Sequence, residues 1–112
     1  MQNPVYEECI AACNSCAAAC DHCASACLDE ADVDKMVDCI RLDMDCAQIC
    51  RLAAAYMARD SEFAQPLCQF CAEICAACAD ECARHEAMHC QACAQACRAC
   101  AEQCRRMDGE QL

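Results

Sequence analysis

Along most of this chain, residues of types that favour burial recur at alternating intervals of three and four residues, and most of them are cysteine. The positions between them carry many alanine, acidic and amide residues. A spacing of three and four places side chains on one face of an α-helix, as on the inward stripe of a bundle helix. Three segments have a nearly continuous stripe of this kind, formed by Cys9, Cys13, Cys16, Cys20, Cys23 and Cys27, by Cys68, Cys71, Cys75, Cys78 and Cys82, and by Cys90, Cys93, Cys97, Cys100 and Cys104.

The first two helices can be placed from their flanking residues. Asn3 followed by Pro4 is typical of a helix start, with an N-cap and a proline in the first turn. We expect the first helix at about 4–28. The acidic stretch 29–32 is expected to be a loop, and the second helix should cover about 33–59.

The third and fourth helices follow from proline and glycine. Asp60 and Ser61 are expected to cap a helix at about 62–85. Pro66 either lies in its first turn or marks a break after a short helical piece, because a proline inside a helix costs ~3 kcal/mol. The fourth helix is expected at about 88–107, with Gly109 as its stop signal.

Short connections make neighbouring helices antiparallel. The sequence therefore predicts an all-α protein, an antiparallel up-down-up-down four-helix bundle with a cysteine-lined core. We expect one domain over residues 1–112.

The second helix has fewer thiols, namely Cys39, Cys46 and Cys50, and it places Asp43 on the same stripe. A carboxylate on a buried stripe is costly unless it is paired or coordinated. Two interpretations stand: Asp43 stays hydrated near a helix junction, or it is an accessory metal ligand.

Composition narrows the possible functions. The chain has 19 cysteines, one glycine and two prolines, and its net charge is −11. The acidic surface argues against nucleic acid or an anionic membrane as a partner. No basic and apolar leader is recognisable at the N-terminus, and no segment is apolar enough to span a membrane, so we expect a cytoplasmic protein with reduced thiols.

The antiparallel order also predicts two different ends of the bundle. The aromatic residues Tyr6, Tyr56, Phe63 and Phe70 come from helix ends that meet at one end, where we expect a plug. The opposite end collects several soft or borderline metal ligands: Cys27, Met36, Cys39, Cys82, His85, Met88, His89 and Cys90. We expect copper to load there, at His85 and His89. The alternative is that these aromatics and methionines only fill gaps or form an oligomer contact.

A row of buried thiols is typical of a store for a thiophilic metal. Thiolate is the binding species, so each ligand loses a proton when metal binds. Cu(I) replaces H⁺ one for one and keeps the core neutral, whereas Zn²⁺ with four thiolates leaves two negative charges. Only eight lysines and arginines are available, and none lies on a cysteine stripe. The predicted cargo is Cu(I), at about one ion per cysteine.

The cysteines also have alternative uses. Six C-x-x-C pairs are compatible with zinc or thiol/disulfide redox chemistry; they are Cys13/Cys16, Cys20/Cys23, Cys68/Cys71, Cys75/Cys78, Cys90/Cys93 and Cys97/Cys100. No glycine flanks any pair to make the tight turn of a zinc knuckle. An iron–sulfur cluster would use four thiolates and leave most of the cysteines without a role. Another thiophilic metal or a redox role remains the alternative to copper.

A motif typical of zinc proteases is also present. His85-Glu86-Ala87-Met88-His89 matches H-E-x-x-H. The chain is too small for a protease cleft, and the segment falls where the third helix turns into the fourth. Both histidines continue the stripe of Cys82, so we expect a non-enzymatic role, while His22 lies off the stripe as a surface residue.

Taken together, the chain resembles the bacterial four-helix-bundle copper storage proteins. The likeness is carried by the stretches CIAACNSCAAACDHCASAC, CQFCAEICAACADEC and HCQACAQACRACAEQC, joined through CIRLDMDCAQIC. The resemblance implies a cytosolic store of many Cu(I) ions for copper homeostasis and detoxification. It also implies that all nineteen cysteines are ligands, that His85 and His89 line an opening, and that the assembly is a homotetramer.

Overall fold

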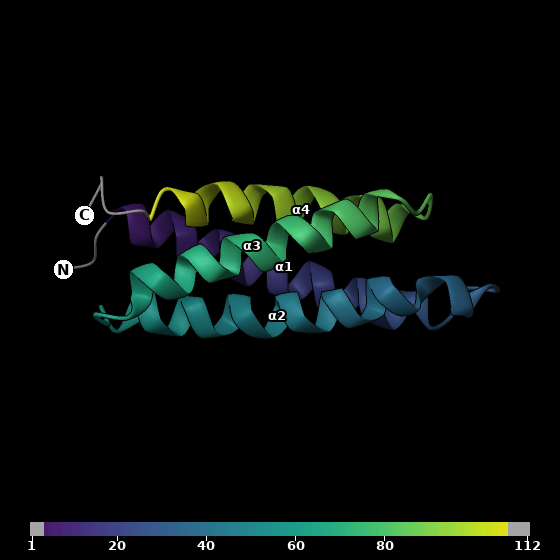
Figure 1. Cartoon of the computed structure of the whole chain (residues 1–112), viewed down its shortest axis with the longest axis horizontal. Helices are drawn as coiled ribbons and strands as arrows, with labels where there is room; N and C mark the ends of the chain where they lie inside the picture. Colours follow the sequence, from purple (N-terminus) through teal and green to yellow (C-terminus); the bar gives the residue numbers. More distant parts are fainter. Residues whose placement is uncertain (1–3, 108–112) are drawn as a thin grey trace.

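The computed structural model describes residues 4–107, which form four long α-helices and one short 3-10 helix. The elements are α1 (Pro4–Cys27), η1 (Val33–Met36), α2 (Val37–Ala58), α3 (Ala64–Ala83) and α4 (Met88–Arg105). The chain runs along the long axis of the molecule and back twice, so that α1 begins where α4 ends (Figure 1).

Each helix packs against two neighbours. α1 lies against α2 and α4, and α3 lies against the same two helices from the other side (Figure 1). The resulting rod measures 48 × 19 × 18 Å. The predicted antiparallel four-helix bundle is therefore confirmed. Within residues 4–107, no helix combines the length and apolar character needed to cross a membrane.

The bundle core is built almost entirely from small side chains. All nineteen cysteines are fully buried. Buried alanines follow directly after several of them, and their small side chains let the helices approach closely; they are Ala17, Ala47, Ala72, Ala79, Ala94 and Ala101. The cysteine stripe predicted from the sequence is therefore the core of the bundle.

The second helix starts later than predicted. Residues 33–36 form the 3-10 helix η1, and the α-helix begins only at Val37. The amide of Lys35 donates to the carbonyl of Asp32 at 3.0 Å, an i to i+3 bond that tightens this turn. The Asp32 side chain makes no capping hydrogen bond and instead pairs with Lys35 at 3.2 Å.

The third helix begins after a tight turn. Asp60 has a positive φ of 54°, a left-handed conformation in which aspartate is enriched. The Ser61 hydroxyl accepts a hydrogen bond from the amide of Phe63 at 3.0 Å, and the helix starts at Ala64. Pro66 lies in the first turn, as predicted. The predicted signals at Asn3 and Gly109 lie outside the described residues.

The end of the bundle where α1 begins is closed, but the predicted aromatic plug is wrong for two of its four residues. Tyr6 is buried and Tyr56 packs partly buried against the core, whereas Phe63 and Phe70 are 60% and 53% exposed. The cysteine spacing explains this difference: Ala64 stands four residues before Cys68 and takes the stripe position, while Phe63 and Phe70 fall beside it. Met57 and Met107, both fully buried, fill the core at this end instead.

Candidate metal centre

The sulfur atoms form a continuous column through the bundle, built from all four helices. Neighbouring helices bring Cys16 and Cys46 to 3.6 Å, Cys46 and Cys75 to 3.5 Å, and Cys20 and Cys97 to 3.6 Å. Along one helix, sulfurs four residues apart lie at 3.8–4.0 Å, as in Cys71–Cys75 and Cys100–Cys104. The helical stripe thus supplies contacts along the axis, and the bundle supplies contacts across it.

These thiols assemble into groups of four whose sulfur atoms all lie within 4.8 Å of one another. The groups include Cys13/Cys71/Cys100/Cys104, Cys16/Cys46/Cys50/Cys75, Cys16/Cys20/Cys46/Cys97, Cys20/Cys78/Cys93/Cys97 and Cys23/Cys27/Cys39/Cys90. Several cysteines belong to more than one group. Separate tetrathiolate sites need ligands of their own, whereas shared thiols suit a metal that accepts bridging sulfur.

None of the cysteines forms a disulfide; all nineteen are free thiols. Burial raises the pKa of the Cys90 thiol to about 11 and also raises the pKa of Cys27. Without metal, Cys90 and Cys27 therefore stay protonated at neutral pH. A metal that binds at these two thiols must displace their protons.

Asp43 is the one buried charged residue of the described core. Its Oδ1 accepts hydrogen bonds from the thiols of Cys78 at 3.2 Å, Cys93 at 3.3 Å and Cys82 at 3.4 Å. Its Oδ2 lies 3.7 Å from the Cys39 sulfur. The interpretation of a hydrated residue near a helix junction is therefore wrong, because Asp43 is fully enclosed by thiols. Burial raises the pKa of Asp43 from 3.8 to about 8.

The opposite end of the column meets a histidine. His89 follows the first residue of α4, and its Nδ1 lies 3.5 Å from the sulfurs of both Cys23 and Cys90, and 4.0 Å from that of Cys27. On the other edge of the ring, Nε2 lies 2.8 Å from the carboxylate of Glu30. His89 therefore joins the last thiols of the core to the acidic loop between α1 and η1.

His85 behaves differently from His89. Its Nε2 lies 2.8 Å from the carboxylate of Glu81, one turn earlier in the chain. No contact between His85 and a sulfur is recorded within residues 4–107. The two histidines predicted together from the sequence thus separate into one that touches the thiols and one that does not.

A hollow marks this end of the bundle. Its walls come from the loop after α1, from η1 and from the connection between α3 and α4; they include Glu30, Met36, His85 and Ala87. Met36 is buried, whereas Met88 is 87% exposed and lies outside this lining. Of the two methionines predicted at this end, only Met36 is close to the core.

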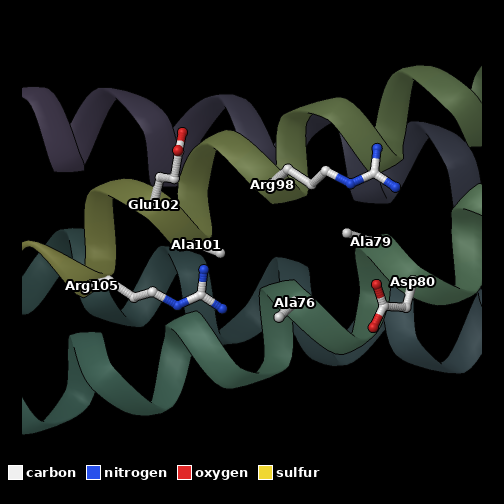
Figure 2. Close-up of a pocket in the computed structure, with 7 residues that line it drawn as sticks. All are labelled: Ala76, Ala79, Asp80, Arg98, Ala101, Glu102 and Arg105. Carbon is white, nitrogen blue, oxygen red and sulfur yellow. The ribbon is translucent and has the colours of Figure 1, made fainter.

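A second hollow, on the side of the bundle, offers no comparable access. Its lining comes from α3 and α4, with Ala76, Ala79 and Ala101 between the charged side chains of Asp80, Arg98, Glu102 and Arg105 (Figure 2). None of the residues that line it is a cysteine. The buried alanines here separate the groove from the sulfur column.

Glu30 is the residue that sequence reasoning missed. It lies in a polar stretch outside the cysteine stripe, and nothing in the spacing ties it to a histidine 59 positions further along the chain. The antiparallel topology was the only available signal, since it brings the end of α1 close to the start of α4.

The fold and the thiol column define a class of protein: a four-helix bundle whose core binds thiophilic metal ions. Residues 2–109 match the copper storage protein family. The chain therefore belongs to this family of metal stores, which are not enzymes.

Individual relatives agree with this assignment. The chain is 50% identical to the Cu(I)-bound copper storage protein BsCsp3, with a TM-score of 0.90 over 94% of this chain and 99% of that one. It is 44% identical to a cytosolic copper storage protein from Streptomyces lividans with five coppers, with a TM-score of 0.90 over 93% and 92% of the two chains. It is also 52% identical over 83 residues to the uncharacterized cysteine-rich protein YhjQ of Bacillus subtilis (strain 168), which corresponds to 74% of this chain and 77% of the relative.

Proposed function

We propose that this protein stores Cu(I) in the cytosol for copper homeostasis and detoxification, as one bundle domain over residues 1–112. All nineteen cysteines are the proposed ligands, at about one Cu(I) per thiol. The observation that carries this proposal is the continuity of the sulfur column, in which thiol groups of four share members.

Charge supports copper over zinc as the cargo. The thiols are fully buried, and among residues 4–107 no lysine or arginine is buried in the core to balance excess thiolate. One Cu(I) in place of one proton leaves the core neutral. Zn²⁺ in separate four-thiolate sites would leave negative charge in a medium where an uncompensated charge costs several kcal/mol.

Copper is proposed to load at the end that carries His85 and His89. The contacts of His89 Nδ1 with three sulfurs support a direct role for His89. His85 lines the hollow outside it and would act earlier, while copper is still near the surface. From His89 the ion would pass between neighbouring thiols by ligand exchange.

A titration tests the cargo and its stoichiometry. The reduced apo protein is titrated anaerobically with Cu(I) against a competing chelator, and thiols and released protons are counted in parallel. We expect uptake of well over ten Cu(I) ions per chain with about one proton released per ion. Saturation near five Zn²⁺ with weak copper uptake would establish discrete tetrathiolate zinc sites instead.

We also propose that the chain assembles with copies of itself, as a homotetramer. A mostly apolar hollow on the side of α2 and α3 supports self-association. It is lined by Ile49, Leu52, Phe70 and Ile74 together with Asp45 and Gln48, and Leu52 and Phe70 are 46% and 53% exposed. Analytical ultracentrifugation tests this. A tetramer that dissociates in Phe70→Ser supports the proposal, and a monomeric parent protein contradicts it.

A further inference from the structure

We propose that Glu30 is a positioning residue for copper loading. Its carboxylate fixes the orientation and the tautomer of the His89 ring, so that an unprotonated Nδ1 faces the last thiols of the core. This inference rests on the proposed copper-storage function, and it concerns a residue that is itself not a ligand.

The two edges of the His89 ring have opposite surroundings. Nε2 lies 2.8 Å from an oxygen of Glu30, and a carboxylate can only accept a hydrogen bond. Nε2 therefore carries the ring proton and donates it to Glu30. In a neutral imidazole the other nitrogen then has a free lone pair. That nitrogen, Nδ1, is the one within 3.5 Å of the sulfurs of Cys23 and Cys90.

The backbone restricts where the Glu30 carboxylate can lie. The amide of Glu30 donates to the carbonyl of Cys27 at 3.2 Å, which holds the loop against the end of α1. Glu30 also lines the hollow at this end, and its side chain is 39% exposed while that of His89 is 14% exposed. Glu30 thus holds His89 from the solvent side while the thiols face it from the core side.

The second histidine–carboxylate pair shows that a carboxylate contact alone does not place a histidine against the thiols. His85 and Glu81 are also 2.8 Å apart, but Glu81 additionally accepts a hydrogen bond from Arg84 at 3.2 Å. In the part of the chain that the structure describes, neither member of this pair forms a hydrogen bond with a cysteine sulfur. Only Glu30 orients a ring whose free nitrogen points at the thiols.

Groups that orient a metal-ligating histidine typically change metal affinity by 10–100-fold when they are removed. Both side chains are partly exposed here, and solvent weakens their interaction. We therefore expect Glu30→Ala to weaken Cu(I) binding at this end by about tenfold, the lower end of that range, and to slow the first phase of uptake by less than His89→Ala does.

The first test reads the tautomer directly. Ring nitrogens of the reduced, ¹⁵N-labelled apo protein are assigned by NMR at a pH where the imidazole is neutral, with His89→Gln to identify the signals. We expect the Nε2–H tautomer of His89 in the parent protein and a mixture of tautomers in Glu30→Ala. An Nδ1–H tautomer in the parent, or an unchanged tautomer in Glu30→Ala, would overturn the inference.

The second test distinguishes a hydrogen bond from Glu30 to His89 from a general attraction of the cation by the negative charge of Glu30. Glu30→Gln keeps an oxygen that can accept from Nε2–H, so it should keep the tautomer and lose less uptake rate than Glu30→Ala. Asp29→Ala removes an equal charge from the same loop at an exposed residue and should leave both readouts unchanged. Equal slowing in Glu30→Gln and Asp29→Ala would mean that Glu30 only attracts the cation, which contradicts the inference.

The two proposals can fail separately. If the parent protein takes up no Cu(I), copper storage is wrong, and the tautomer measurement on the apo protein still decides what Glu30 does. If the parent fills normally and Glu30→Ala fills at the same rate, the role of Glu30 is wrong and copper storage stands.

Discussion

The two ends of the sulfur column are built on the same helical stripes but differ in chemistry. At one end the stripes finish in Tyr6, Met57 and Met107, which are buried and of which only Tyr6 is ionisable. At the other end the thiols meet His89, which is held by Glu30 beside a solvent hollow. If copper loads at His89 as proposed, the residue types at the ends of a common stripe decide where metal exchanges.

The closed end should be structural only. Met57→Ala removes a fully buried side chain and leaves a cavity, so the free energy of unfolding of the apo protein should fall by about 3 kcal/mol. Urea denaturation measures this loss, and stopped-flow mixing should show an unchanged rate of Cu(I) uptake. Slower uptake in this variant would mean that copper also enters at the closed end.

Pairs of thiols from the two ends provide a matched comparison. Cys27 and Cys90 lie 3.9 Å apart beside His89, and Cys9 and Cys104 lie 3.6 Å apart at the closed end. Each pair replaced by serine should lower the copper capacity by about two ions. Only the Cys27→Ser/Cys90→Ser variant should also take up Cu(I) more slowly. If each lost ligand adds about 1.4 kcal/mol to the activation barrier of uptake, the rate should fall by about hundredfold. Equal rates in the two double variants would remove the distinction between the ends.

The two histidines should differ as well. His89→Ala removes the nitrogen that touches the thiols and should slow Cu(I) uptake by about tenfold, equivalent to about 1.4 kcal/mol. His85→Ala should have a smaller effect, because no sulfur contact of His85 is recorded in residues 4–107. Stopped-flow mixing with a Cu(I)–chelator complex measures both rates. A double variant that fills as fast as the parent would disprove loading at this end.

Asp43, inside the column, should make apo stability depend on pH. The pKa of Asp43 is raised from 3.8 to about 8 in the folded protein, chiefly by burial, so the folded state binds this proton more tightly than the unfolded state. Its contribution to stability is complete below about pH 4 and is lost as the pH rises towards 8. The free energy of unfolding should therefore fall with pH by up to about 1.4 kcal/mol per unit between these two pKa values.

Denaturation of the metal-free protein between pH 5 and 7.5 checks this slope. Asp43→Asn has no carboxyl proton to lose and should show a much flatter profile over the same range. A parent protein whose stability rises with pH in this window would show that the folded state does not hold the Asp43 proton.

Much of the fold and of the thiol site could be predicted because both depend on one periodic signal. The spacing of cysteine fixed the buried face of three helices, and Cys39, Cys46 and Cys50 extended it to α2. Pro66 marked the first turn of α3 correctly, because proline is tolerated there and not further in.

The remaining features depend on geometry that spacing does not encode. Phe63 and Phe70 come from the expected end of the bundle, yet the direction of their side chains follows from their offset to Cys68. The difference between His85 and His89 depends on how the α3–α4 connection turns. The partner of His89 comes from a distant loop, and such contacts leave no pattern in a single sequence.

The most direct test of the central claim is a crystal structure of the protein saturated with Cu(I), with copper located by anomalous scattering. We predict copper along the whole sulfur column, from the thiols beside His89 to those at Cys9 and Cys104, bridged by shared cysteines. Copper confined to the surface histidines, or a few isolated ions each with four thiolates of its own, would contradict storage along a continuous thiol core.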